Sequence, residues 1–199
     1  MQERLRLIDA VRQAVCEHRD ELTRLDQAIG DGDHGESMQR GFDALFAERE
    51  KIAGLALCEG LVAAGRTLVM TMGGASGPLY GTFLMELGKT LPEDPDRAAL
   101  AAAFRHATER VGARGRSQPG QKTLLDVLHP VADALADGVP AAEIARIADD
   151  AARATVPMLA TKGRAAFLGE RSIGHMDPGA RSAALVIGAV CSALQGDRR

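Results

Sequence analysis

The sequence predicts an all-helical protein that folds as one domain over residues 1–199. Hydrophobic residues make up 46% of the chain, but aromatic residues make up only 3% and there is no tryptophan. Alanine and leucine therefore dominate, which is typical of helices packed through small side chains. Apolar residues also recur at helical spacing in most segments between glycine-rich stretches. A β-sandwich would need more valine, threonine and tyrosine.

The helices are expected in the following order. The first fifteen residues should form an amphipathic helix, because their apolar residues recur at helical spacing: Leu5, Ile8, Val11, Ala14 and Val15. The same periodicity predicts helices over Leu22–Asp26, Glu36–Glu50, Leu55–Met72, Pro78–Leu91, Arg97–Val111, Lys122–Ala136, Ala141–Leu159 and Pro178–Leu194. Two junctions are marked by Pro92 with Pro95 and by Gly138 with Pro140. Residues 183–191 also fit a buried strand, but their alanine and serine neighbours favour a helix, which gives eight or nine helices in all.

Charge and cysteine content exclude several classes of protein. With 24 lysines and arginines against 27 aspartates and glutamates, the net charge of -3 gives no field that attracts nucleic acid or an anionic membrane. Charges interrupt the first apolar stretch, so we expect no secretory signal and a cytoplasmic location. No later segment has the length of uninterrupted apolar sequence that a membrane span needs. Cys16, Cys58 and Cys191 are odd in number and lack CxxC spacing, which argues against disulfides or zinc and favours small buried apolar side chains.

Four polar, glycine-rich stretches interrupt the helical pattern: AIGDGDHG, MGGASG, GARGRSQPGQKT and GERSIGHMDPGA. Short connections between helices need only a few turn residues. Loops rich in glycine, aspartate, histidine and serine are instead typical of phosphate and metal sites. The candidate functional residues are therefore expected in these four stretches.

The first stretch brings three carboxylates, Asp26, Asp31 and Asp33, within eight residues, and its glycines allow them to converge. A cluster of aspartates without a nearby cysteine offers hard oxygen ligands, which suit Mg²⁺ or Ca²⁺ better than zinc. The alternative is that Asp31 and Asp33 only form turns and cap the helix that begins near Glu36. Spacing alone leaves both interpretations open.

The second stretch, residues 72–77, joins one helix to the next at Pro78. This places backbone N–H groups and the Ser76 hydroxyl at a helix N-terminus, where phosphate binds readily. The alternative is a glycine that ends one helix and a proline that begins the next. The only Gly-Lys-Thr, at residues 88–90, has Phe83 in place of the leading glycine of a P-loop, which excludes that motif.

Basic residues surround the third and fourth stretches: Arg114, Arg116, Lys122, Arg164, Arg171 and Arg181. Each could pair with phosphate, or could be a solvated surface charge. The sequence alone does not distinguish between these roles.

Taken in order, DQAIGDGDHG, GGASGPLYG, PGQKTLLD and GERSIGHMDPGA resemble the L subunit of dihydroxyacetone kinase. That subunit corresponds to the nucleotide-binding domain of the single-chain ATP-dependent kinases. The resemblance spans nearly the whole chain, with all four motifs in the expected order. It implies a closed barrel of about eight antiparallel helices with the nucleotide site in the loops at one end, in agreement with the helix count.

The resemblance also implies the residues of the site. Asp26, Asp31 and Asp33 would hold two Mg²⁺ ions that bridge the phosphates of ADP or ATP. The nucleotide would lie against the first-loop residues His34, Gly35, Glu36 and Ser37, the phosphate-binding turn of Ala75 and Ser76, and the pocket residues Gly115, Leu124, Arg164, Asp177, Pro178 and Gly179. No nucleophile from this chain is implied, because catalysis would be electrostatic and would act through the metal ions and Arg164.

By the same resemblance, dihydroxyacetone is held on a separate K subunit, without which this chain is expected to be inactive. A chain of this length resembles the phosphotransferase-system version, in which a phosphohistidine on an M subunit rephosphorylates bound ADP. The alternatives are an ATP-dependent kinase subunit for a related ketose or sugar alcohol, and a nucleotide-loaded module that binds a transcription regulator; a homodimer is also compatible. Ser37, Gln121 and Leu124 depart from the common family pattern and bear on nucleotide affinity.

Overall fold

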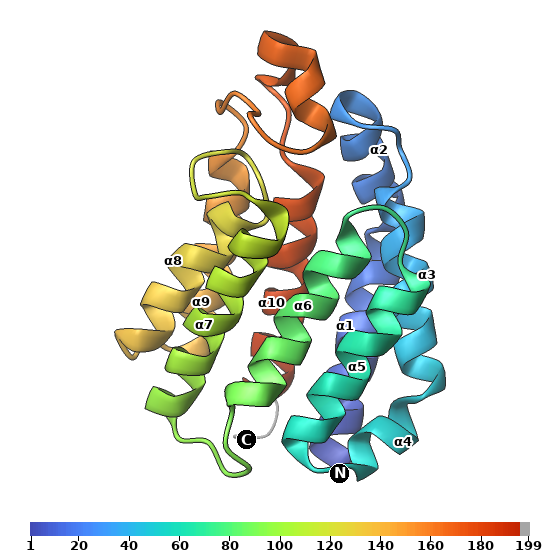
Figure 1. Cartoon of the computed structure of the whole chain (residues 1–199), viewed down its shortest axis with the longest axis vertical. Coiled ribbons are helices and arrows are strands. Elements are labelled where there is room, and N and C mark those ends of the chain that lie inside the picture. The colour runs from blue at the N-terminus through green and yellow to red at the C-terminus, as the bar shows by residue number, and fades with distance from the viewer. Residues whose placement is uncertain (196–199) are drawn as a thin grey trace.

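The computed structural model describes residues 1–195, which form ten α-helices and one 3-10 helix without a strand (Figure 1). The elements are α1 (Gln2–Glu17), α2 (Arg19–Ile29), α3 (His34–Ala47), α4 (Arg49–Gly54), α5 (Leu57–Thr71), α6 (Ser76–Thr90), α7 (Arg97–Gly115), α8 (Leu125–Ala136), α9 (Ala141–Ala154), η1 (Arg164–Ser172) and α10 (Pro178–Gln195). The all-helical expectation is confirmed. Residues 196–199 of the predicted single domain lie outside the described residues.

Eight of these helices form a closed ring. Each packs against the next in the order α1, α3, α5, α6, α7, α8, α9, α10, and α10 packs back against α1. Around this ring the helices alternate in direction (Figure 1), which confirms the expected barrel of antiparallel helices. The remaining two α-helices, α2 and α4, connect members of the ring at its two ends.

Small residues let the helices of the ring approach closely. A Cβ atom on Gly65 of α5 would lie 2.7 Å from the carbonyl oxygen of Gly81 on α6, so these two helices meet backbone to backbone. Two large apolar clusters fill the interior, one centred on α1, α3 and α5 and one on α7, α8 and α9. Phe83 and Phe104 pack edge to face between α6 and α7, with ring centroids 4.9 Å apart.

Three helix boundaries differ from the expected ones for backbone reasons. The stretch Glu36–Glu50 is divided at Glu48 into α3 and α4. The stretch Lys122–Ala136 begins only at Leu125, because Lys122 has a φ of 62°, which no α-helix accepts. The stretch Ala141–Leu159 ends at Ala154, shortly before Pro157, which disfavours helical geometry in the residue that precedes it.

Other expectations are corrected in detail. The helix expected over Leu22–Asp26 is longer and runs from Arg19 to Ile29, and η1 was not expected at all. Cys191 is buried as expected, whereas Cys16 and Cys58 are only half-buried. Residues 183–191 are helical, which excludes the strand alternative. Within residues 1–195, the helices are too short or too polar to cross a lipid bilayer.

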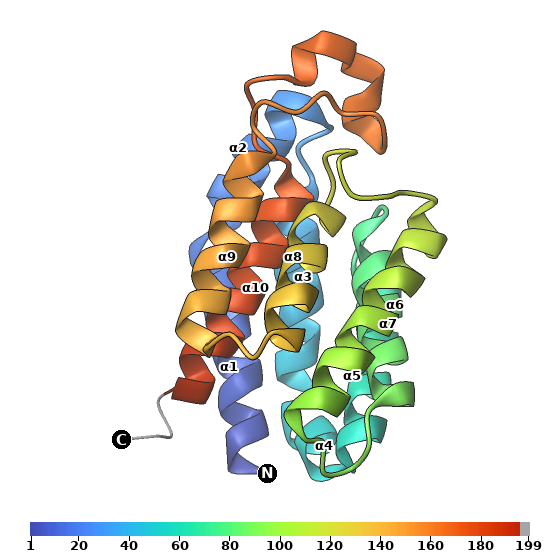
Figure 2. The same ribbon diagram turned by 90° about the vertical axis from the view of Figure 1, so that its left-hand side faces the viewer.

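The alternating ring brings all four glycine-rich stretches to the same end. The loops α2–α3, α5–α6 and α7–α8, together with the segment between α9 and α10, gather at the end opposite the N-terminus (Figure 1). In the perpendicular view, the segment that contains η1 still lies over this end of the ring (Figure 2). This arrangement places the candidate residues of distant parts of the sequence around one space.

Candidate functional site

A pocket of about 170 Å³ opens at this end of the ring. Its walls are formed by residues of Asp26–His34, Gly73–Tyr80, Lys122–Leu124, Lys162–Ala165 and Asp177–Gly179. A hollow of about 400 Å³ between Arg19 and Asp43 is larger but more open, and it lacks a cluster of ligand atoms. The chemistry of the four loops therefore identifies the smaller pocket as the candidate site.

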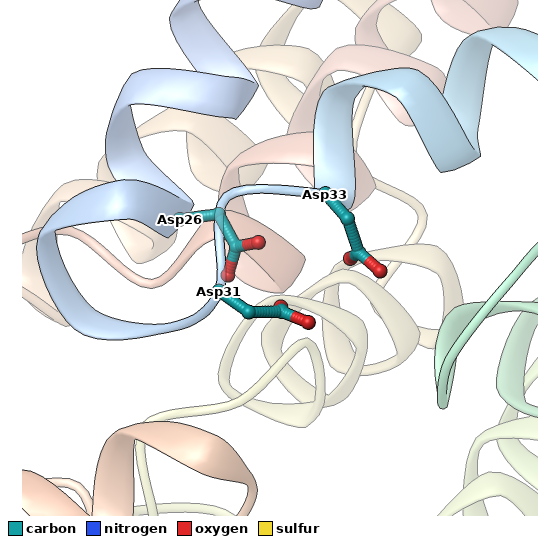
Figure 3. Close-up of side chains that lie close together, drawn as sticks. All are labelled: Asp26, Asp31 and Asp33. Atoms are coloured by element: carbon teal, nitrogen blue, oxygen red, sulfur yellow. The ribbon is translucent and has the colours of Figure 1, made fainter.

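Three carboxylates converge at one wall of the pocket. Asp26, Asp31 and Asp33 each offer an oxygen atom, and these atoms lie within 4.8 Å of one another. Figure 3 shows the three side chains pointing into a common space from the end of α2, the loop and the start of α3. Gly30 makes this possible, because a Cβ atom there would lie 2.1 Å from Asp26 Oδ1.

The electrostatics of the cluster favour a bound cation. Burial, followed by the charges of Asp31 and Asp26, raises the pKa of Asp33. Asp33 precedes α3, but its side chain makes no capping hydrogen bond, so the interpretation of Asp33 as a simple helix cap is not supported. Asp31 forms an ion pair with Arg164, and Asp26 Oδ2 accepts the backbone N–H of His34 at 3.1 Å. Three hard oxygen donors that repel one another fit Mg²⁺ or Ca²⁺.

The second loop faces the carboxylates across the pocket. Gly74 has a φ of 62°, and α6 begins at Ser76, so the turn directs free backbone N–H groups of the first helical turn toward the space. Ser37 supports this turn from α3: its Oγ accepts the N–H of Gly73 at 2.8 Å and donates to the Gly73 carbonyl oxygen at 3.2 Å. Ser37 is buried and lies behind the pocket wall.

Several helix N-termini surround the pocket. Because the ring alternates in direction, α3, α6, α8 and α10 all begin at this end. The first residues of three of them, His34, Ser76 and Pro178, line the pocket. The positive ends of their dipoles favour a bound anion such as phosphate, beside carboxylates that favour a cation.

His34 is buried beneath the second loop and uses both ring nitrogens. Its Nδ1 lies 3.2 Å from Ser76 Oγ, and its Nε2 lies 2.9 Å from Ser182 Oγ on α10. Ser182 Oγ also lies 2.8 Å from the hydroxyl of Tyr80. Sequence reasoning assigned no role to Tyr80 or Ser182, and only the contact of Ser182 with both His34 and Tyr80 reveals them.

Lys122 does not point at the pocket as a free cation. Its Nζ donates hydrogen bonds to the carbonyl oxygens of Ser172 at 2.7 Å, Met158 at 3.1 Å and Val156 at 3.5 Å. The residue is only 1% exposed, and burial lowers the pKa of its ammonium group. The phosphate role considered for Lys122 is therefore replaced by a structural one, in which it fastens the segment between α9 and α10.

The arginines of the fourth stretch separate into different roles. Arg164 reaches the pocket, where it pairs with Asp31 and keeps 61% of its side chain exposed. Arg181 pairs instead with Glu21 at 2.6 Å and Asp149 at 2.8 Å, between α2, α9 and α10. Arg164 is thus available to a phosphate, whereas Arg181 holds helices together.

Asp177 caps α10 at the floor of the pocket. Its Oδ2 accepts the N–H of Ala180 at 2.7 Å, and burial raises its pKa to about 7. A Cβ atom on Gly179 would lie 3.0 Å from this oxygen and 3.7 Å from the backbone nitrogen of Leu124. Gly179 therefore keeps the floor open between α10 and the third loop.

Four of the expected site residues do not line the pocket: Gly35, Glu36, Ser37 and Gly115. Gly35 packs against α2, where a Cβ atom would lie 2.2 Å from the Arg19 carbonyl oxygen. Glu36 pairs with Arg19 at 3.0 Å on the outer surface. Gly115 ends α7 next to the side chain of Leu79, which does line the pocket.

Comparison with known families gives a match over most of the chain. Residues 28–192 match the DAK2 domain. A relative from Listeria innocua serovar 6a, named PEP-dependent dihydroxyacetone kinase 1, ADP-binding subunit, is 41% identical over 190 residues, 94% of this chain and 93% of that protein. The ADP-binding subunit of a PEP-dependent dihydroxyacetone kinase from Escherichia coli K12 is 42% identical over 171 residues, 81% of each chain.

Longer proteins contain a similar region. A D-erythrulose kinase from Mycolicibacterium smegmatis is 38% identical over 196 residues, which are 90% of this chain but only 33% of that kinase. The crystal structure of the C. freundii dihydroxyacetone kinase in complex with AMP-PNP and Mg²⁺ superposes with a TM-score of 0.77 at 23% identity, over 96% of this chain and 34% of that one. This structural likeness shows a shared fold.

Proposed function

The chain belongs to the DAK2 domain family, and we propose that it is the nucleotide-binding subunit of a dihydroxyacetone kinase. One observation carries the proposal: a cluster of three carboxylates faces a glycine-rich turn at a helix N-terminus across one pocket. The carboxylates suit a divalent cation and the turn suits a phosphate, which together match a metal-bound nucleotide. Relatives matched over most of their length that are named ADP-binding subunits support the same function.

The proposed binding set divides the pocket into two halves. Asp26, Asp31 and Asp33 would hold two Mg²⁺ ions, which neutralise charge on the phosphates when bound. Ala75 and Ser76 form the turn on the opposite side, and the rest of the pocket is lined by His34, Leu124, Arg164, Asp177, Pro178 and Gly179. Gly35 and Ser37 act from behind the wall, and Gly115 reaches the pocket only through its neighbour Leu79. Glu36 lies on the outer surface, where it pairs with Arg19.

The residues of this chain would act by position and charge. Arg164, which pairs with Asp31, would also offer its guanidinium group to a phosphate oxygen at this side of the pocket. The free N–H groups at the start of α6 would orient the terminal phosphate. The mechanism needs no nucleophile from this chain, and transfer would pass directly to an acceptor hydroxyl presented from outside.

That acceptor is proposed to be dihydroxyacetone on a separate K subunit. For the phosphoryl donor we propose a phosphohistidine on an M subunit, which would rephosphorylate ADP that remains bound. The names of the relatives support this route, since they include PEP-dependent and PTS-dependent dihydroxyacetone kinase subunits. In this arrangement ADP behaves as a cofactor and leaves the protein slowly.

Calorimetry of ADP binding with and without Mg²⁺ tests the proposal. Three clustered carboxylates repel a diphosphate unless a cation lies between them, so we expect no ADP binding in excess EDTA. The double variant Asp31→Asn, Asp33→Asn should lose binding in Mg²⁺ as well. A matched control is Asp94→Asn, Asp137→Asn, which removes the same charge from two exposed loop positions away from the pocket. Tight binding in EDTA, or undiminished binding by the first variant, contradicts the proposal.

The nucleotide content of the purified protein tests the donor. A retained cofactor predicts near-stoichiometric ADP in acid extracts, whereas an ATP-dependent subunit purifies largely empty. After the nucleotide is stripped, Mg·ADP at about 100 times its dissociation constant should add roughly 2.7 kcal/mol to stability. For a chain of this size that raises the melting temperature by about 5 to 10 °C. A stripped, folded protein whose melting temperature ignores both Mg·ADP and Mg·ATP would refute nucleotide binding.

A further inference from the structure

The lysine and arginine side chains that line the pocket differ in their partners. Lys122 Nζ is held by three backbone carbonyl oxygens, and Arg164 pairs with Asp31. Lys162 is different, because its ammonium group makes no hydrogen bond and no ion pair with any residue in the described range 1–195. Since Lys162 is half-buried, the pocket wall contains a cation without a counter-charge.

The backbone on both sides of Lys162 is held in place. Before it, the N–H of Ala160 donates to Ser172 Oγ at 3.0 Å. After it, Ala165 is buried in a small apolar cluster with Ile29 of α2. The Cα atom of Lys162 therefore has a defined position on the pocket wall, from which the flexible four-carbon side chain can move its ammonium group.

Lys162 belongs to the segment between α9 and α10, which lies over the end of the ring where the pocket opens (Figure 2). In the proposed function, the acceptor hydroxyl approaches the pocket from outside this end. The part of a bound nucleotide that must meet the acceptor is its terminal phosphate. A lysine on the outermost segment of the pocket wall is therefore placed on the side where the terminal phosphate meets the acceptor.

The charge that the pocket must balance increases when bound ADP becomes ATP, because the added phosphoryl group is anionic. The three aspartates attract divalent cations, and Arg164 shares its charge with Asp31. Lys162 supplies a positive charge that no carboxylate of the described residues neutralises. Its ammonium group is a compact charge with three donors on a flexible stem, which suits a phosphoryl group that changes position during transfer.

We propose that Lys162 binds the terminal phosphoryl group of ATP by donating N–H hydrogen bonds to its free oxygen atoms. This inference rests on the proposed function, since it requires a nucleotide in the pocket. Lys162 forms no covalent bond and transfers no proton in this role. It distinguishes the phosphorylated nucleotide from ADP, whereas the aspartate cluster and the turn at the start of α6 serve both nucleotides.

Calorimetry of the nucleotide-stripped protein with Mg·ADP and with Mg·AMP-PNP, a stable analogue of ATP, tests the inference. Lys162→Met removes the charge and keeps an apolar stem. The Kd of Mg·AMP-PNP should then rise by about 10-fold or more, which corresponds to the loss of a hydrogen bond to a charged group. The Kd of Mg·ADP should change little, because ADP lacks the group that Lys162 contacts. Since Lys162 has no partner to lose, the melting temperature of the nucleotide-free variant should also stay close to that of the native protein.

Two further variants serve as controls. Lys162→Arg keeps the charge and should retain tight binding of Mg·AMP-PNP, whereas a loss as large as in Lys162→Met overturns the role of the charge. Lys51→Met removes an exposed lysine of α4, at the opposite end of the ring, and should change neither constant.

The two constants also separate the inference from the proposed function. If the native protein binds Mg·ADP, but both constants of Lys162→Met are native or rise by the same factor, the assignment to the terminal phosphoryl group is overturned and the proposed function stands. A marked fall in the melting temperature of Lys162→Met would reveal a structural contact and would likewise overturn the inference. A native protein that binds neither nucleotide in Mg²⁺ refutes the proposed function, and the inference with it.

Discussion

Replacing Lys122 by methionine should destabilise the protein before it affects the nucleotide. In the native protein, Lys122 Nζ satisfies three backbone carbonyl groups of the segment that joins α9 to α10. The residue also adopts a φ of 62°, a conformation that costs a residue with a Cβ atom about 1 to 2 kcal/mol. The three hydrogen bonds hold the backbone in this conformation, and methionine retains the strain while losing the bonds.

The size of the effect follows from burial. At 1% exposure, water does not replace the lost donor, so the abandoned carbonyl groups of Ser172 and Met158 cost about 1 to 3 kcal/mol each. The Val156 carbonyl keeps a bond from the N–H of Gly174 at 2.9 Å. Some relaxation of the segment is expected, which gives a total of about 3 to 5 kcal/mol, the range observed when one partner of a buried charged contact is removed. At about 2 to 4 °C per kcal/mol for a chain of this length, the melting temperature should fall by about 6 to 20 °C.

Thermal unfolding of the nucleotide-free protein measures this effect, and Lys89→Met is the matched control. Lys89 is 57% exposed and pairs only with Glu86 at 2.7 Å, so its loss should change the melting temperature by little. A Lys122→Met variant that melts close to the native protein, yet no longer gains stability from Mg·ADP, would refute the structural role. That result would instead make Lys122 a phosphate ligand.

Three further predictions concern the loops. Gly30→Ala places a methyl group 2.1 Å from Asp26 Oδ1 and should displace that carboxylate, which weakens Mg²⁺-dependent ADP binding in calorimetry; unchanged binding would remove Asp26 from the metal site. Gly74→Val should abolish nucleotide binding with little change in far-UV helicity, because Gly74 has a φ of 62° beside the phosphate turn; normal binding would make the turn a mere connection. Burial raises the pKa of Asp177 from 3.8 to about 7, so the native protein retains a proton that the unfolded chain releases, and the contribution of this carboxyl to stability falls as pH rises through that window. Asp177→Asn keeps a capping acceptor and should remove that slope in urea denaturation of the metal-free protein; an unaltered pH dependence would contradict the raised pKa.

The sequence determined the class of the fold and the position of the loops. Helical periodicity and the scarcity of aromatic residues are local properties, and the helices appear where apolar residues recur. The placement of Asp26, Asp31 and Asp33 among glycines predicted their convergence, since eight residues with permissive backbone angles leave little choice of direction. The motif resemblance named the barrel and the family, which the all-helical ring and the match to residues 28–192 confirm.

Boundaries that depend on one backbone angle were not predictable in this way. Lys122 is a residue that would continue a helix by propensity, yet it takes a left-handed conformation because its ammonium group is held by three carbonyl groups from distant residues. The start of α8 is therefore decided by a contact made across 50 residues of sequence, and local preference is overridden.

The tertiary structure alone decided which polar residues act together. His34 and Ser182 are separated by 148 positions, and Tyr80 and Ser182 by 102. No periodicity or spacing links them, because the contact exists only when the ring closes and brings α3, α6 and α10 together. The same closure separates Arg164, which faces the pocket, from Arg181, which binds Glu21 and Asp149 behind it. The sequence does not show which neighbours a charged side chain will have, because tertiary packing determines them.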